Sequence, residues 1–182
     1  MVSTTLGYDK REDRVWLSFD DGTPRLWFTR RLVSHLLGPM LRPFEASAPG
    51  GQGGAGAAIR VALEHELAMN EPLPGEVAPP MKMGLEAPDA SPDADDQLCT
   101  GLNAAFDAGQ CRISFHTREG ERVLQMGRVG MHRWLRGLHL LVRHAEWELL
   151  APEWLTRSCL PEAMRSLVQG AASLPPDANP GH

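Results

Sequence analysis

Residues 14–28 read RVWLSFDDGTPRLWF, and residues 111–126 read CRISFHTREGERVLQM. In each stretch apolar residues recur at every second position on both sides of a turn, which contains Asp-Gly in the first and Glu-Gly in the second. Alternation with a period of two is typical of half-buried strands, and glycine supplies the positive φ of a tight turn. Both stretches lead directly into an amphipathic helical pattern, so the chain contains a β-hairpin-plus-helix unit twice.

This repeat predicts an α+β fold, because a half-buried sheet needs a helix with an apolar face to cover it. We expect a small antiparallel sheet of about five strands, packed by about three helices at roughly 32–41, 57–69 and 129–149. Pro43 is expected to end the first of these helices. The strands could associate in chain order, or the two halves of the chain could exchange partners.

Composition divides the chain into segments. We expect a flexible N-terminus at 1–12, a single α+β domain at 13–170 and a disordered tail at 171–182. Residues 71–96 combine six prolines with acidic and small residues. Such a segment buries too little apolar surface to offset its ordering entropy, so we expect a long, mobile, disordered acidic loop there.

Charge and cysteine content narrow the class of protein. The formal net charge of −5 argues against a globally basic nucleic-acid binder. The three cysteines are an odd number without Cys-x-x-Cys spacing, which is typical of reduced thiols. The N-terminal residues are too polar for a signal peptide, and no apolar run approaches the ~20 residues of a spanning helix. We therefore expect a soluble cytoplasmic protein without a membrane partner.

The helix expected at 129–149 carries an apolar seam with alternating spacings of four and three residues, the a/d pattern of a coiled coil. Such a seam can pack on the sheet of its own chain, or it can form a homodimer. Trp147 lies off the seam, where it can anchor a partner or pack on the segment that follows. The interface predicted for self-association is Met131, Leu135, Leu138, Val142 and Trp147.

The other side of the same helix carries a basic stripe, which consists of Arg128, His132, Arg136, His139 and Arg143. Its simplest interpretation is the solvated polar face of a surface helix. The stripe is also a candidate anion-binding site for nucleic acid, for an acidic protein partner or for the acidic residues at 89–96. His132 and His139 are two turns apart, about 10.5 Å along the axis, which is too far to share a metal ion.

Two motif-like stretches lack the context that their chemistry needs. Residues 51–56 match the dinucleotide fingerprint G-x-G-x-x-G, but no buried strand precedes them. His65 and Glu66 open like the zinc signature H-E-x-x-H, but Met69 stands where the second histidine should be. We therefore expect no cofactor and no metal site.

Catalytic groups are equally hard to assemble. Cys111 and His116 lie five residues apart on one strand, hence on opposite faces, which separates a nucleophile from its base. A hydrolase or transferase built on Cys99 or around His65 remains a minor alternative. We expect no catalytic residue and favour a non-enzymatic protein-interaction or adaptor module, which could self-associate through the helix at 129–149. The alternative is a nucleic-acid-associated module that uses the basic stripe.

Overall fold

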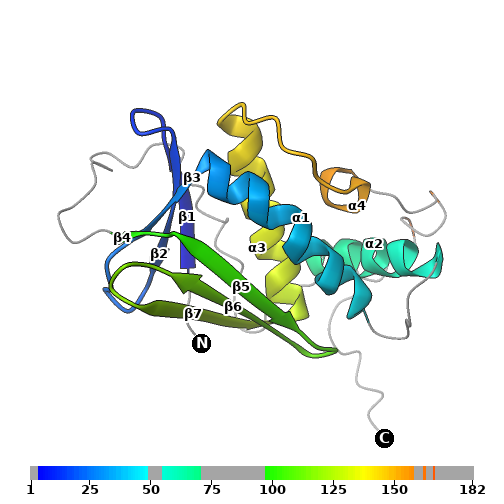
Figure 1. The fold of residues 1–182 in the computed structure, drawn as a ribbon. Coiled ribbons are helices and arrows are strands. Elements are labelled where there is room, and N and C mark those ends of the chain that lie inside the picture. The colour runs from blue at the N-terminus through cyan, green and yellow to red at the C-terminus, as the bar shows by residue number, and fades with distance from the viewer. Residues whose placement is uncertain (1–3, 49–54, 71–96, 158–161, 163–165, 167–182) are drawn as a thin grey trace, which may run out of the picture.

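The computed structural model describes residues 4–48, 55–70, 97–157, 162 and 166 (Figure 1). The expected loop at 71–96 and tail at 171–182 lie outside these residues, as does most of the glycine-rich stretch at 51–56. The described part confirms the α+β fold class. Its elements in chain order are β1 (Thr4–Asp9), β2 (Arg14–Phe19), β3 (Leu26–Thr29), α1 (Arg30–Ala46), α2 (Ala55–Asn70), β4 (Gln97–Leu98), β5 (Gly101–Phe106), β6 (Gln110–His116), β7 (Glu121–Gly127), α3 (Arg128–His144) and α4 (Glu153–Thr156).

The strands form two sheets that meet at one stretch of chain. The first sheet has the order β1-β2-β3-β4, in which β4 runs parallel to β3 and the other pairs are antiparallel. The second sheet is antiparallel and has the order β5-β6-β7. Only Cys99 and Thr100 separate β4 from β5 (Figure 1). The two halves of the chain therefore share a sheet, because β4 of the second half pairs with β3 of the first.

The helices cover the strands in two layers. Helices α1 and α3 lie against the strands, while α2 and α4 pack on α3 from the other side. Figure 1 accordingly shows the strands on one side of the molecule and the helices on the other. Helix α3 is therefore covered on two sides, by strands and by the outer helices.

The alternation seen in the sequence places one face of each hairpin in a common core. Val15 pairs with Phe28 and Leu17 with Leu26 in the first sheet, while Ile113 pairs with Leu124 in the second. All of these side chains are buried in one hydrophobic cluster. Trp16 and Trp27 pair on the opposite face of the first hairpin. The core is thus built jointly by both hairpin-plus-helix units.

Residues 4–9, which we expected to belong to a flexible N-terminus, form the edge strand β1 instead. They pair with β2 from Thr4 opposite Phe19 to Asp9 opposite Arg14. Leu6 and Tyr8 pack against the core, although neither is fully buried. An edge strand can be held mainly by its backbone ladder, so this segment needs few apolar residues.

Helix α1 continues through two prolines, whereas we expected it to end at Pro43. Thr29 caps the helix by accepting a hydrogen bond from the Leu32 amide at 3.2 Å. Pro39 and Pro43 are one turn apart and both are exposed, so the missing N–H groups fall on the solvent side. Continuation to Ala46 buries the Phe44 side chain completely, which offsets the lost backbone bonds.

Helix α3 ends at His144, earlier than the predicted Leu149. Glu146 adopts a positive φ of 56°. The amides of Glu146 and Trp147 donate to the carbonyls of Arg143 and Val142 at 3.1 and 3.0 Å, the hydrogen-bond pattern of a Schellman motif. This reversal ends the helix and turns Trp147 back toward the core.

Candidate functional site

The contact between α2 and α3 is built around a part-buried ion pair. Arg128 donates Nε–H and Nη2–H to the two carboxylate oxygens of Glu64, both at 2.7 Å. Such bidentate pairs are the strong form of arginine–carboxylate recognition. The guanidinium also donates to Ser47 Oγ at 2.8 Å and lies 4.4 Å from the centre of the Phe44 ring. Arg128 therefore ties the end of α1, the middle of α2 and the start of α3 together.

His132 lies one turn after Arg128 and is buried beside the same carboxylate. Its Nε2 is 3.5 Å from Glu64 Oε2, longer than a good hydrogen bond, so Arg128 is the main partner of Glu64. Burial raises the pKa of Glu64, but His132 and Arg128 outweigh it and lower the pKa to about 2. Three aromatic rings with centres 4.9–5.6 Å away surround His132: Phe44, His65 and Trp154. This polar cluster holds helices together and offers no reactive group to solvent.

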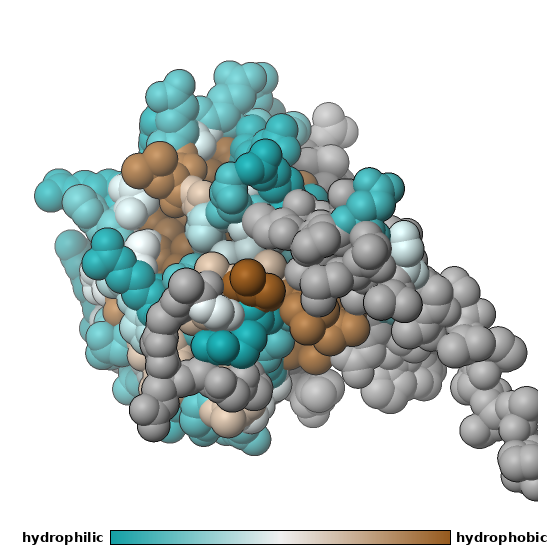
Figure 2. Space-filling model, turned by 90° about the vertical axis from the view of Figure 1, so that its right-hand side faces the viewer, coloured by the Kyte–Doolittle hydropathy of each residue, from teal (hydrophilic) through white to brown (hydrophobic). Residues whose placement is uncertain are grey.

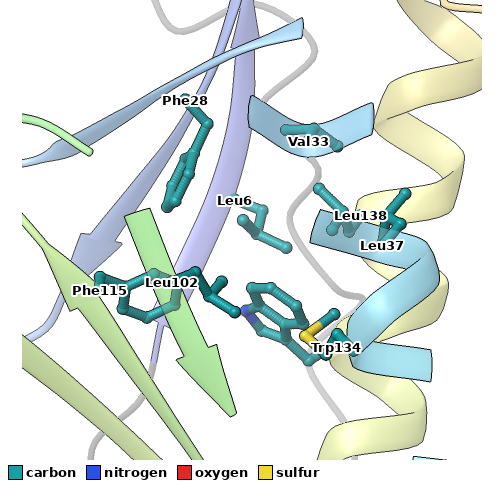
Figure 3. Close-up of a pocket in the computed structure, with 9 residues that line it drawn as sticks. Leu6, Phe28, Val33, Leu37, Leu102, Phe115, Trp134 and Leu138 are labelled. Carbon is teal, nitrogen blue, oxygen red and sulfur yellow. The ribbon is translucent and has the colours of Figure 1, made fainter. Parts of the chain in front are cut away.

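An apolar cavity of about 20 Å³ lies where the strands meet α1 and α3 (Figure 3). This volume holds about one water molecule, and a buried water needs at least two polar partners. The only polar side-chain group in the lining is the Trp134 Nε1–H, which has no hydrogen-bond partner. The cavity is therefore a packing gap between the layers. Its lining residues are Leu6, Phe28, Val33, Leu37, Met40, Leu102, Phe115, Trp134 and Leu138.

A larger and more polar pocket of about 150 Å³ opens between α2, α3 and α4. Its lining residues are His65, Glu66, Met69, Arg136, Trp154, Leu155, Thr156 and Arg157. His65 is only 6% exposed, and its Nδ1 has no hydrogen-bond partner. Burial, helped by the charges of His132 and Arg136, lowers the pKa of His65 to about 4. The imidazole is therefore neutral near pH 7 and can act as both donor and acceptor.

Helix α2 turns an apolar face toward solvent. Ile59 is 60% exposed and Leu67 is 47% exposed, with the half-buried Leu63 between them. Residues four apart lie on one side of a helix, so these three side chains form a single stripe. The packed side of α2 instead carries Val61 and His65, together with small residues. Figure 2, which views the side of the molecule where α2 lies, shows brown hydrophobic surface exposed among teal. Below, this stripe is called the outer face of α2.

The structure places the predicted self-association seam inside the chain. Its five members are between 0% and 6% exposed and all belong to the hydrophobic core cluster: Met131, Leu135, Leu138, Val142 and Trp147. The core side of α3 is covered by the chain's own strands and by α1. None of these side chains is therefore available at the surface of the folded chain.

The predicted basic stripe does not face solvent as one surface. Arg128, His132 and His139 are buried, because α2 and α4 cover this side of α3. Burial, with the charges of Arg136 and Arg143, also lowers the pKa of His139. Arg136 is half-buried and donates Nη1–H to the Leu155 carbonyl at 3.0 Å, while Arg143 is exposed. A polyanion cannot reach all five residues without displacing the outer helices.

The buried thiols are unsuited to nucleophilic catalysis. Burial raises the pKa of both Cys99 and Cys111 to about 11, so both stay protonated near neutral pH. The thiolate is the nucleophilic form of cysteine. Cys111 faces the core, whereas His116 hydrogen-bonds to Asn103 at 3.0 Å on the other face of the sheet. Among the described residues, no cluster of three or more His, Cys, Asp or Glu side chains could hold a metal ion.

Searches of family models, curated proteins and solved structures found no match to this chain. In the part of the chain that the structure describes, no helix has the length and apolar character needed to cross a membrane. The pocket beside His65 and the outer face of α2 are surface features of the described residues that a ligand or partner can reach.

Proposed function

We propose that this protein is a non-enzymatic, cytoplasmic protein-interaction module that binds an apolar segment of a protein partner on the outer face of α2. The observation that carries the proposal is the exposure of Ile59 and Leu67 on the side of α2 opposite its packed side. Anchors at i, i+4 and i+8 match the spacing with which helices present apolar side chains to a partner. Leaving such a stripe in water is unfavourable, so a partner that covers it gains binding energy.

Other features support an interaction role over a catalytic one. The two described thiols are buried and free of disulfides, as expected for a protein kept in a reducing compartment. At the centre of the helical layers, the Glu64 carboxylate is paired with Arg128 and so is not free to act as a general base. Arg60 is half-buried at the flank of the stripe, and its Nε–H has no hydrogen-bond partner among the described residues, so its guanidinium is available to an acidic residue of the partner.

Site-specific photo-crosslinking in cells tests this proposal. A crosslinking residue is placed at position 59 or 67, and control residues at Ser34 and Leu150, which are exposed on other parts of the surface. We expect discrete adducts from positions 59 and 67 that disappear when Leu63→Asp is added. An adduct of twice the mass of the chain would identify a second copy as the partner. Adducts that are absent from α2, or equally strong at the controls, would overturn the proposal.

A further inference from the structure

The pocket between α2, α3 and α4 adjoins the outer face of α2. Glu66 and Met69 belong to α2 and line the pocket, and Met69 is itself exposed. We propose that this pocket binds a carboxylate group of the partner segment, with Arg136 as the principal donor and His65 as a second donor. This inference rests on the proposed function, because the carboxylate belongs to the segment that docks on α2.

Arg136 carries a charge that no carboxylate of the described residues neutralises. None of the ion pairs found there includes it. Its one hydrogen bond runs from Nη1 to the Leu155 carbonyl, which leaves most of its five N–H donors unused. The planar guanidinium fork matches a carboxylate in a bidentate arrangement. A half-buried arginine with spare donors is therefore a ready partner for an incoming anion.

His65 is held in a fixed orientation at the same pocket. Its ring centre lies 5.4 Å from that of His132 and 5.3 Å from that of Trp154. Its Nδ1 is buried without a partner, and among the described contacts no hydrogen bond satisfies the other ring nitrogen either. The charge of Arg136 contributes to the lowered pKa of His65, so a carboxylate bound between them should raise that pKa.

The other charged residues that line the pocket determine which class of anion it can bind. Arg157 is already paired with Glu153. Glu66 contributes a negative charge that forms no ion pair with Arg136. A singly charged carboxylate neutralises the charge of Arg136, whereas a phosphate dianion would leave a second negative charge uncompensated beside Glu66 in a part-buried pocket. The pocket therefore favours an acidic side chain or a chain terminus of a peptide.

Titration of the full chain with acetate and with inorganic phosphate, followed by NMR of the His65 ring, tests the pocket without the partner. We expect saturable acetate binding that raises the His65 pKa and is weakened at least about tenfold by Arg136→Gln. Arg143→Gln, on the same helix but outside the pocket, should bind acetate like the original chain. Absence of acetate binding, equal binding by Arg136→Gln or tighter binding of phosphate would each overturn the assignment.

Crosslinking from position 59 in the Arg136→Gln variant separates this inference from the proposed function. We expect the adduct to weaken in that variant and to persist in Arg143→Gln. An adduct at full yield in Arg136→Gln would show that α2 binds its partner without the pocket, which overturns only the carboxylate assignment. Arg136-dependent acetate binding without any adduct at position 59 or 67 would overturn the proposed function and leave the pocket as an anion site.

Discussion

Trp147 donates its indole Nε1–H to Asp13 Oδ1 at 2.8 Å, across 134 positions of the sequence. The Tyr8 hydroxyl donates to the same oxygen at 2.8 Å. These hydrogen bonds from Trp147 and Tyr8 lower the pKa of Asp13. One carboxylate in the β1–β2 turn thus fixes the segment that follows α3, which explains why Trp147 leaves the helix and packs inward.

Removal of one donor to Asp13 should weaken this connection. We expect Trp147→Phe or Tyr8→Phe to lower the free energy of unfolding by about 0.5–1.5 kcal/mol, the range for a typical hydrogen bond, because Asp13 is exposed and water screens its charge. Urea unfolding measures the change. In an Asp13→Gly background, which keeps the positive φ but removes the acceptor, Tyr8→Phe should cost clearly less. An equal cost in both backgrounds would mean that the Tyr8 hydroxyl does not act through Asp13.

Loss of the Arg128 side chain should be among the most damaging changes on α3. Arg128→Met leaves the Glu64 carboxylate part-buried and unpaired, so we expect a loss of about 3–5 kcal/mol in the free energy of unfolding. The matched control, Arg143→Met, removes an exposed arginine from the same helix and should change it by less than about 0.5 kcal/mol. Adding Glu64→Leu to Arg128→Met should restore part of the lost free energy of unfolding, because it removes the unpaired carboxylate.

Substitution of Leu138 tests whether the apolar seam packs inside the chain or between two chains. Because Leu138 is buried in the core, Leu138→Ala should lower the free energy of unfolding by about 2–5 kcal/mol. Its mass in solution, measured by light scattering, should match that of the original chain. Leu150→Ala is the control, since Leu150 is 99% exposed. A changed mass at unchanged stability would instead assign the seam to an interface between chains.

Gly7 is required because the Trp16 ring lies directly over it. A Cβ at position 7 would lie 2.1 Å from Cζ2 of Trp16, so Gly7→Ala forces the indole to move. We expect a loss of about 1–3 kcal/mol in the free energy of unfolding, as in other overpacked sites. The cost should shrink in a Trp16→Leu background. Gly38→Ala, which meets no atom within 4 Å in α1, should be neutral or stabilising.

Acidification should begin to destabilise the fold near pH 6.5, above the pH range in which carboxylates titrate. Burial lowers the pKa of His65 to about 4 from its usual 6.5, so its stabilising neutral state is fully populated above pH 6.5. That contribution is lost as the pH falls from 6.5 toward 4, because the unfolded chain takes up the proton first. Glu64 adds a further loss only below its usual 4.5, since its folded pKa is about 2.

Urea unfolding at a series of pH values measures this dependence. His65→Gln should reduce the dependence of the free energy of unfolding on pH between about pH 6.5 and 4. The buried His139, whose pKa is also lowered, should still contribute a smaller pH dependence. An unchanged slope in His65→Gln would place the titrating group elsewhere.

Local patterns were sufficient to predict the strands at 14–28 and 111–126, because alternation and turn chemistry act over a few residues. The helix α2 followed from an equally local signal, the spacing of its apolar residues. The edge strand β1 carried too weak an apolar pattern, since its partner β2 and its backbone ladder supply most of its stability. The predicted end of α1 at Pro43 was wrong, because burial of the Phe44 side chain offsets the backbone hydrogen bonds that proline cannot make.

The candidate site was harder to predict, because its contacts join distant parts of the chain. The sequence shows that α2 and α3 have distinct sides, but not which element covers each side. The ion pair that orients α2 joins residues 64 positions apart, and it turns Ile59 and Leu67 outward. The sequence also does not show how many N–H donors of Arg136 stay unused. That number depends on the position of the Leu155 carbonyl, which accepts one of them.

The stretch from β4 to β5 makes the two halves of the chain mutually dependent. The amides of Gln97 and Cys99 donate to the carbonyls of Arg25 and Trp27 at 2.9 Å, so the second half completes the sheet of the first. A chain cut between residues 70 and 97 would leave one fragment with an open strand edge and both with half a core. Each fragment alone should stay unfolded, and the two mixed together should reconstitute the native fold. Split-protein complementation is therefore built into this topology, despite the duplicated appearance of its parts.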